Sequence, residues 1–176
     1  PKDGALYGVR DQRLIGRAEN GAAFSAKFRF TVEGQPVEIR RPAVHRYVDR
    51  VYGELERPVI VVPPVGVSLP ERSIVVADAA ARRVEVTVQA NAANAQGTVS
   101  LEAGAGWTIA PASQAFALKD ADEQKTLIFN VTPPRQESDT TLQAVALVGG
   151  TRITESVDVI SYPHIPPQTL FPPAAA

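Results

Sequence analysis

The amino-acid sequence predicts an all-β protein. Its 176 residues are 44% hydrophobic and 21% charged, with a net charge of −1, which is typical of a chain that folds into one large or two small domains. The 15 prolines make up roughly 8.5% of the chain, against a usual ~5%. Between them, short runs alternate apolar with polar residues, as half-buried strands do. We therefore expect strands joined by punctuated loops and almost no helix.

The clearest strand pattern lies at residues 24–32, where Phe24, Phe28, Phe30 and Val32 stand between polar residues. The pattern predicts a half-buried strand, a turn at 34–36 and a second hairpin arm at 37–40. Further short strands are expected on both sides. Residues 1–60 are thus predicted to form a small β-sandwich unit, which is incomplete if some of its strands lie upstream.

A second domain is predicted after Pro63-Pro64, because a proline pair removes two backbone donors and stiffens the chain. Residues 61–66 are interpreted as a Pro-rich linker. Residues 67–162 then offer about eight or nine short strands, spaced by about 8–12 residues, with the single tryptophan near the middle, a pattern typical of an immunoglobulin-like β-sandwich. One expected strand is Ser73–Val76, and Gly149-Gly150 suits a type I′ hairpin turn.

Residues 163–176 are predicted to be an extended Pro-rich tail. The sequence begins without an initiator methionine and ends in Pro and Ala residues, so we expect it to be a piece of a longer chain.

The residue types exclude several kinds of chemistry. Without cysteine there is no disulfide framework, thiolate nucleophile or cysteine metal site, and two histidines, His45 and His164, cannot build a His-rich metal site. No G-x-S-x-G, G-x-G-x-x-G or P-loop string occurs. We therefore predict no catalytic, metal-binding or cofactor-binding residue, and no cofactor.

Two classes of partner are also disfavoured. Arginines at 40–50 are interleaved with Glu38 and Asp49, which is typical of a solvated or docking face rather than a nucleic-acid site. No stretch approaches the ~18–20 apolar residues of a membrane span. Trp107 is open to two interpretations, an anchor in the core of the sandwich or a platform on which a sugar ring stacks.

Two segments are predicted to contact neighbouring domains of the same polypeptide. Residues 37–58 combine arginine with tyrosine, a mixture enriched at protein interfaces because both bury area and keep polar ends paired. Residues 162–171 place apolar and aromatic side chains between prolines, where they must dock or remain exposed. The candidate contact residues are Arg40, Arg46, Tyr47, Tyr52, Arg57, Tyr162, His164 and Phe171.

Several strings resemble known bacterial modules. VEVTVQANAANAQGTVSLEAGAGWTIAP and KTLIFNVTPP look like the sandwich domain that accompanies many bacterial glycosidases. PAVHRYVDRVYGELERPVIVVPPVGVSL and SYPHIPPQTLFPPA are similar to the non-catalytic middle region of large bacterial proteins of the PIG-L deacetylase family. This second resemblance spans about residues 37–173.

The resemblance implies a zinc-dependent N-acetylglucosaminyl deacetylase domain upstream and a further domain after the tail. Such deacetylases take their metal and base from an HPDDE-type string and a later histidine, neither of which is found here. The chain is thus expected to be a non-catalytic accessory module of a hydrolase parent, and the alternative is a carbohydrate-binding module. Long members of this family are usually exported, so the resemblance also implies a periplasmic or extracellular location.

Overall fold

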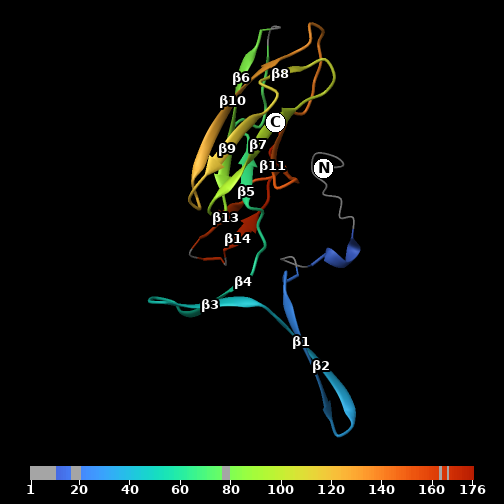
Figure 1. The fold of residues 1–176 in the computed structure, drawn as a ribbon. Coiled ribbons are helices and arrows are strands. Elements are labelled where there is room, and N and C mark those ends of the chain that lie inside the picture. Colours follow the sequence, from blue (N-terminus) through green and yellow to red (C-terminus); the bar gives the residue numbers. More distant parts are fainter. Residues whose placement is uncertain (1–10, 17–20, 77–79, 163, 166) are drawn as a thin grey trace. The chain divides into compact units, whose positions relative to one another are not determined.

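The computed structural model describes residues 11–16, 21–76, 80–162, 164, 165 and 167–176. Fourteen strands and one short 3-10 helix at Gln12–Leu14 make up its regular structure (Figure 1), so the all-β prediction is confirmed. The chain divides into two compact units, 1–60 and 61–176. No helix in the described ranges is long and apolar enough to cross a bilayer.

The described part of the first unit contains two β-hairpins, each a two-stranded antiparallel sheet, after the short 3-10 helix. Its strands are β1 (Ser25–Val32), β2 (Gln35–Pro42), β3 (Val44–Asp49) and β4 (Gly53–Pro58). Glu33 and Gly34 make the β1–β2 turn with φ of 50° and 81°, the positive values that a two-residue hairpin turn of the primed type requires. The hairpin predicted at residues 24–40 therefore forms, with its turn one residue earlier than expected.

The small sandwich predicted for residues 1–60 is not found among the described residues of this unit, whose sheets are two-stranded. None of the described side chains from 21 to 60 is buried, and the strand at 24–32, expected to be half-buried, is exposed along its whole length. A sandwich needs two apolar faces stacked against each other. In the described part of this unit, the apolar face of β1–β2 has no second sheet over it.

The second unit contains two four-stranded antiparallel sheets. One has the strand order β5-β6-β10-β8 and the other β12-β11-β7-β9. A further hairpin, β13–β14, follows them. The strands are β5 (Val65–Ser68), β6 (Arg82–Ala90), β7 (Ala95–Glu102), β8 (Thr108–Ala110), β9 (Gln114–Leu118), β10 (Gln124–Thr132), β11 (Gln143–Val148), β12 (Thr151–Ile153), β13 (Asp158–Ile160) and β14 (Gln168–Leu170).

One hydrophobic core lies between the two sheets. Every second residue is buried from Val84 to Ala90 in β6 and from Leu127 to Val131 in β10. These side chains form one cluster with Val99 of β7 and Phe116 of β9. Because alternate residues point to opposite faces of a strand, this pattern defines the inner faces of a β-sandwich. The Gly149-Gly150 turn between β11 and β12 has positive φ at both residues, which confirms that prediction.

The C-terminal residues close one edge of this sandwich. Ala174 donates a backbone hydrogen bond to the Thr154 carbonyl (2.8 Å) and accepts one from Ala144 N–H (2.9 Å). Leu142 and Ala176 exchange backbone hydrogen bonds in both directions, and Val67 of β5 donates to the Glu155 carbonyl (3.0 Å). A backbone ladder thus runs from β5 of one sheet through 154–156 and 172–176 to the start of β11 in the other sheet.

Three segments differ from their predicted roles. Val65 and Gly66, placed in the linker at 61–66, are buried residues of β5. Ser73–Val76, predicted as a strand, has no strand pairing. The tail at 163–176, predicted to be extended, contains strand β14 and the segment 172–176, which pairs with the sandwich. The sequence did not predict these backbone hydrogen bonds because the tail has no strand periodicity.

Candidate functional site

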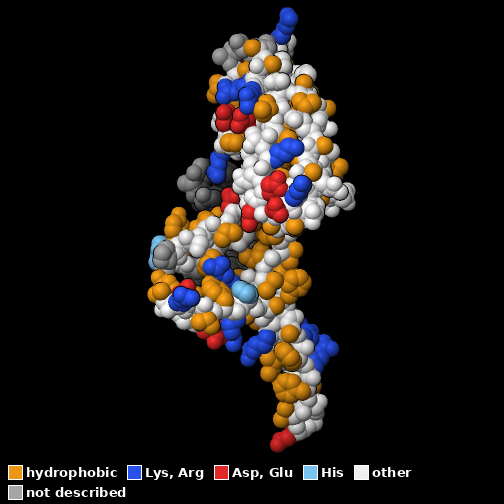
Figure 2. Space-filling view, turned by 60° about the vertical axis from the view of Figure 1, so that its left-hand side comes forward, with side chains coloured by type: hydrophobic (Ala, Val, Ile, Leu, Met, Phe, Trp, Pro, Cys, Tyr) orange, Lys and Arg blue, Asp and Glu red, His pale blue; other side chains and the backbone are white. Residues whose placement is uncertain are grey.

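The β1–β2 hairpin has one apolar and one charged face. Antiparallel pairing puts Phe28 opposite Ile39 and Phe30 opposite Val37 on the same side. Phe28 is 53% exposed and Phe30 is 45% exposed, although side chains of this size are usually buried. Figure 2 shows hydrophobic side chains running along this hairpin. The apolar face is therefore a continuous surface open to a partner.

Glu38 organises the charged face of the same hairpin. Its carboxylate lies 3.1 Å from the Arg40 and Arg29 guanidinium groups and 3.2 Å from the Lys27 ammonium group. The hydrogen bonds from Arg40, then from Arg29 and Lys27, lower the pKa of Glu38 below its ordinary value. Arg40, one of the predicted contact residues, thus belongs to the face opposite the phenylalanines.

The β3–β4 hairpin carries four of the predicted contact residues, three on its strands and Tyr52 in its turn. On one face, the Arg57 guanidinium lies over the Tyr47 ring, 5.1 Å from its centroid, and donates to the Tyr47 hydroxyl (3.0 Å). The His45 ring stacks on Tyr47 with a centroid distance of 5.6 Å. These three side chains form one aromatic and cationic surface, of the composition that protein interfaces favour.

Arg46 projects from the other face of β3–β4. Its guanidinium contacts Glu54 at 3.0 Å and Glu56 at 2.5 Å. In the turn, the Asp49 carboxylate accepts hydrogen bonds from the backbone N–H groups of Tyr52 (2.9 Å) and Val51 (2.7 Å), which lower the pKa of Asp49. Asp49 thereby fixes the turn that presents Tyr52, whose side chain is exposed.

The predicted contact residues of the tail lie in the second unit. Tyr162 and His164 stack with a centroid distance of 5.8 Å, and Tyr162 and Phe171 are exposed. The eight predicted residues are therefore divided between the β1–β2 hairpin, the β3–β4 hairpin and the second unit. Sequence reasoning missed the exposed β1–β2 face, because alternation shows which residues share a face and not what covers it.

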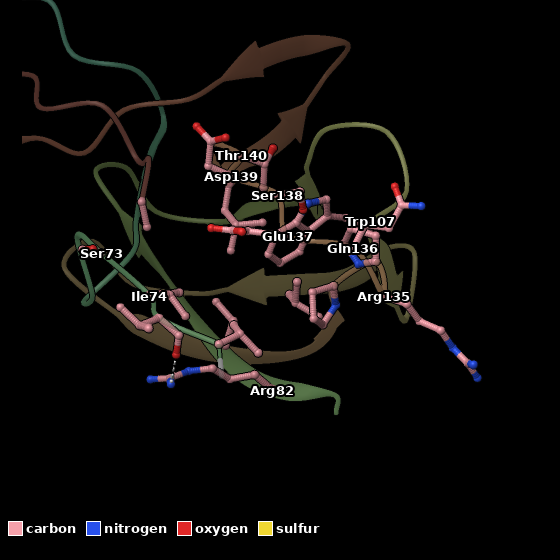
Figure 3. Close-up of a pocket in the computed structure, with 18 of the residues that line it drawn as sticks. Ser73, Ile74, Arg82, Trp107, Arg135, Gln136, Glu137, Ser138, Asp139 and Thr140 are labelled. Carbon is pink, nitrogen blue, oxygen red and sulfur yellow. Dashed lines mark hydrogen bonds between the residues drawn. The ribbon is translucent and has the colours of Figure 1, made fainter. Parts of the chain in front are cut away.

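A pocket of about 570 Å³ opens in the second unit, and sequence reasoning did not predict it. Its walls come from the β5–β6 loop at 72–76, the β10–β11 loop at 133–140, Trp107, Arg82 and Ala176. Trp107 packs partly against the hydrophobic core and also lines this pocket. Figure 3 shows the indole among side chains of the 133–140 loop, with Arg82 across the pocket. The run of exposed polar residues at 135–139 was the available sequence signal.

The described residues contain no group of three or more His, Asp or Glu side chains arranged to hold a metal ion. No protein-family model matches the chain, and no curated protein matches it either.

Proposed function

We propose that this chain is a non-catalytic accessory module that positions neighbouring domains of a PIG-L-type deacetylase parent. The observation that supports this proposal most strongly is the exposed apolar face of β1–β2. An isolated two-stranded hairpin is only marginally stable in water, and a third strand or a packed surface over its apolar face is what stabilises it. A neighbouring domain of the same polypeptide supplies that surface in this proposal.

Two further observations support a docking role. The Tyr47, Arg57 and His45 surface on β3–β4 offers aromatic area, and the polar ends of Arg57 and Tyr47 are already paired with each other. The second unit, by contrast, has a closed core of its own and a paired C-terminal edge. The proposal that the parent is a deacetylase is based on the sequence resemblance at 37–173. The proposed periplasmic or extracellular location has the same basis.

We also propose that the sandwich is immunoglobulin-like. In that fold, strands A, B, E and D form one sheet and C, F and G the other. Strands β5, β6, β10 and β8 follow the first order, while β7, β11 and β12 follow the second. Strand β9 is then an extra strand beside C.

The docking role is tested in the natural full-length protein with two paired variants. Phe28→Ser with Phe30→Ser removes apolar area from the exposed face, and Lys27→Ser with Arg29→Ser changes the opposite face as the matched control. Small-angle scattering should show a looser domain arrangement for the first pair and an unchanged one for the control. Unchanged scattering for both pairs would reject the docking role.

The non-catalytic role is tested on residues 1–176 alone. The chain is incubated with zinc and chitotriose, and released acetate is measured. We expect no release above the zinc blank, and acetate production in proportion to the protein concentration would overturn the proposal.

A further inference from the structure

The pocket beside Trp107 has the size of a small-ligand site. Its volume of about 570 Å³ lies within the roughly 300–1,000 Å³ of small-molecule pockets. We call it the Trp107 pocket. It lies entirely in the sandwich unit, so ligand binding in it is independent of the docking role proposed for the hairpins.

The aromatic wall is held in place by the surrounding loops. The Gly104 N–H donates to the Thr140 hydroxyl at 2.7 Å, which ties the turn before Trp107 to the β10–β11 loop. Gly106 has a φ of 87°, and a Cβ at this position would lie 3.4 Å from Pro134. The core supports part of the indole, and the remaining part is available to a ligand. Such a preformed wall loses little conformational freedom on binding.

The polar lining has unused hydrogen-bonding capacity. Arg82 is engaged with Glu71 (3.1 Å) and the Val75 carbonyl (3.0 Å), as Figure 3 shows in part. The exposed lining residues Arg72, Arg135, Gln136, Glu137, Ser138 and Asp139 make no hydrogen bond or ion pair within the described residues. Together they provide guanidinium and amide donors, carboxylate acceptors and a hydroxyl group.

The charges of the described residues that line the pocket favour a neutral ligand. The free cations Arg72 and Arg135 are balanced by the free anions Glu137 and Asp139, and Arg82 is neutralised by Glu71. A phosphate or sulfate group would need a net excess of cations. A sugar ring instead offers a flat face of C–H groups for an indole and hydroxyl pairs for planar carboxylate, amide and guanidinium groups.

We propose that the Trp107 pocket binds a neutral saccharide. One ring stacks on Trp107, and its hydroxyl groups exchange hydrogen bonds with Glu137 and Asp139 of the β10–β11 loop. Affinity comes from the aromatic wall, and selectivity among sugars comes from the loop.

Binding is measured on residues 1–176 by the fluorescence of the single tryptophan and by NMR. The probes are trisaccharides of β-linked N-acetylglucosamine, β-linked glucose, α-linked glucose, mannose, galactose and xylose. At least one is expected to bind saturably, with chemical-shift changes confined to the pocket. The proposal would be overturned if none of the six trisaccharides bound at a concentration of about 10 mM.

Substitutions then locate the site. Glu137→Gln with Asp139→Asn should weaken binding about tenfold or more, a change of about 1.4 kcal/mol, and should leave the fold intact because both side chains are exposed and unpaired in the described structure. Trp107→Ala should abolish the NMR changes. Tyr52→Ala, in the first unit, is the matched aromatic control and should bind normally. The inference would be contradicted if the Glu137→Gln with Asp139→Asn variant bound the sugar as tightly as the unsubstituted chain. It would also be contradicted if the pocket bound proline-rich peptides and none of the sugars.

Discussion

Ala174→Pro tests the C-terminal closure of the sandwich. Ala174 is 2% exposed, and its N–H donates to the Thr154 carbonyl at 2.8 Å. Proline has no N–H, so the carbonyl loses its backbone partner and keeps only the longer contact from the Gln143 side chain at 3.3 Å. The added ring must also fit into a filled site. The neighbouring Ala175 N–H donates to no backbone acceptor in the described structure, so Ala175→Pro is the matched control.

The two effects set the expected magnitude. Leaving a part-buried carbonyl underpaired costs at most about 1–3 kcal/mol, and overpacking costs about 1–3 kcal/mol. We therefore expect Ala174→Pro to lower the free energy of unfolding by about 2–5 kcal/mol, and Ala175→Pro to change it by less than about 1 kcal/mol.

Urea unfolding followed by tryptophan fluorescence measures this difference, because Trp107 is the single tryptophan and lies in the sandwich unit. Equal stability of the two variants would refute the closure by residues 172–176.

Individual contacts give three further predictions. Gly97→Ala should destabilise the sandwich by about 1–3 kcal/mol in urea unfolding, because a Cβ there would overlap the Leu147 carbonyl oxygen. An unchanged unfolding midpoint would contradict this close approach of β7 and β11. Arg40→Gln should raise the pKa of Glu38 toward its ordinary value in a carboxyl NMR titration, since the Arg40 hydrogen bond is the largest cause of the lowered pKa. Because that pKa is lowered by folding, the stabilisation is present above the unfolded pKa and is lost as the pH falls through the folded one; an unmoved titration would contradict this origin. Asp49→Ala should speed hydrogen exchange at the Val51 and Tyr52 amides that its carboxylate accepts from, and unchanged exchange would show that the turn holds without it.

Locally encoded features could be predicted from the sequence. Gly149-Gly150 predicted its hairpin turn because positive φ is a property of those two residues. The alternation at 24–32 correctly placed Phe28 and Phe30 on one face. Their exposure was not predicted, because burial depends on a second surface that is distant in sequence or belongs to another domain.

Backbone pairing and loop geometry explain the remaining differences. Residues 172–176 have no periodicity, yet their backbone groups pair with β11 and with 154–156. The apolar run Ser73–Val76 resembles a strand, but it lines the Trp107 pocket without a strand partner. The pocket itself is assembled from segments far apart in the chain. The sequence therefore left Trp107 open to two interpretations, a core anchor or a sugar platform, and did not indicate that Trp107 and Glu137 line the same pocket.

Hydrogen exchange of β1 and β2 tests the docking role most directly. The amides of residues 25–42 are compared between the isolated chain and the natural full-length protein, with the core strand β10 as an internal reference. Docking predicts that exchange in β1 and β2 becomes much slower in the full-length protein while β10 is unchanged, because a covered hairpin opens less often. Equal exchange of residues 25–42 in both proteins would contradict it.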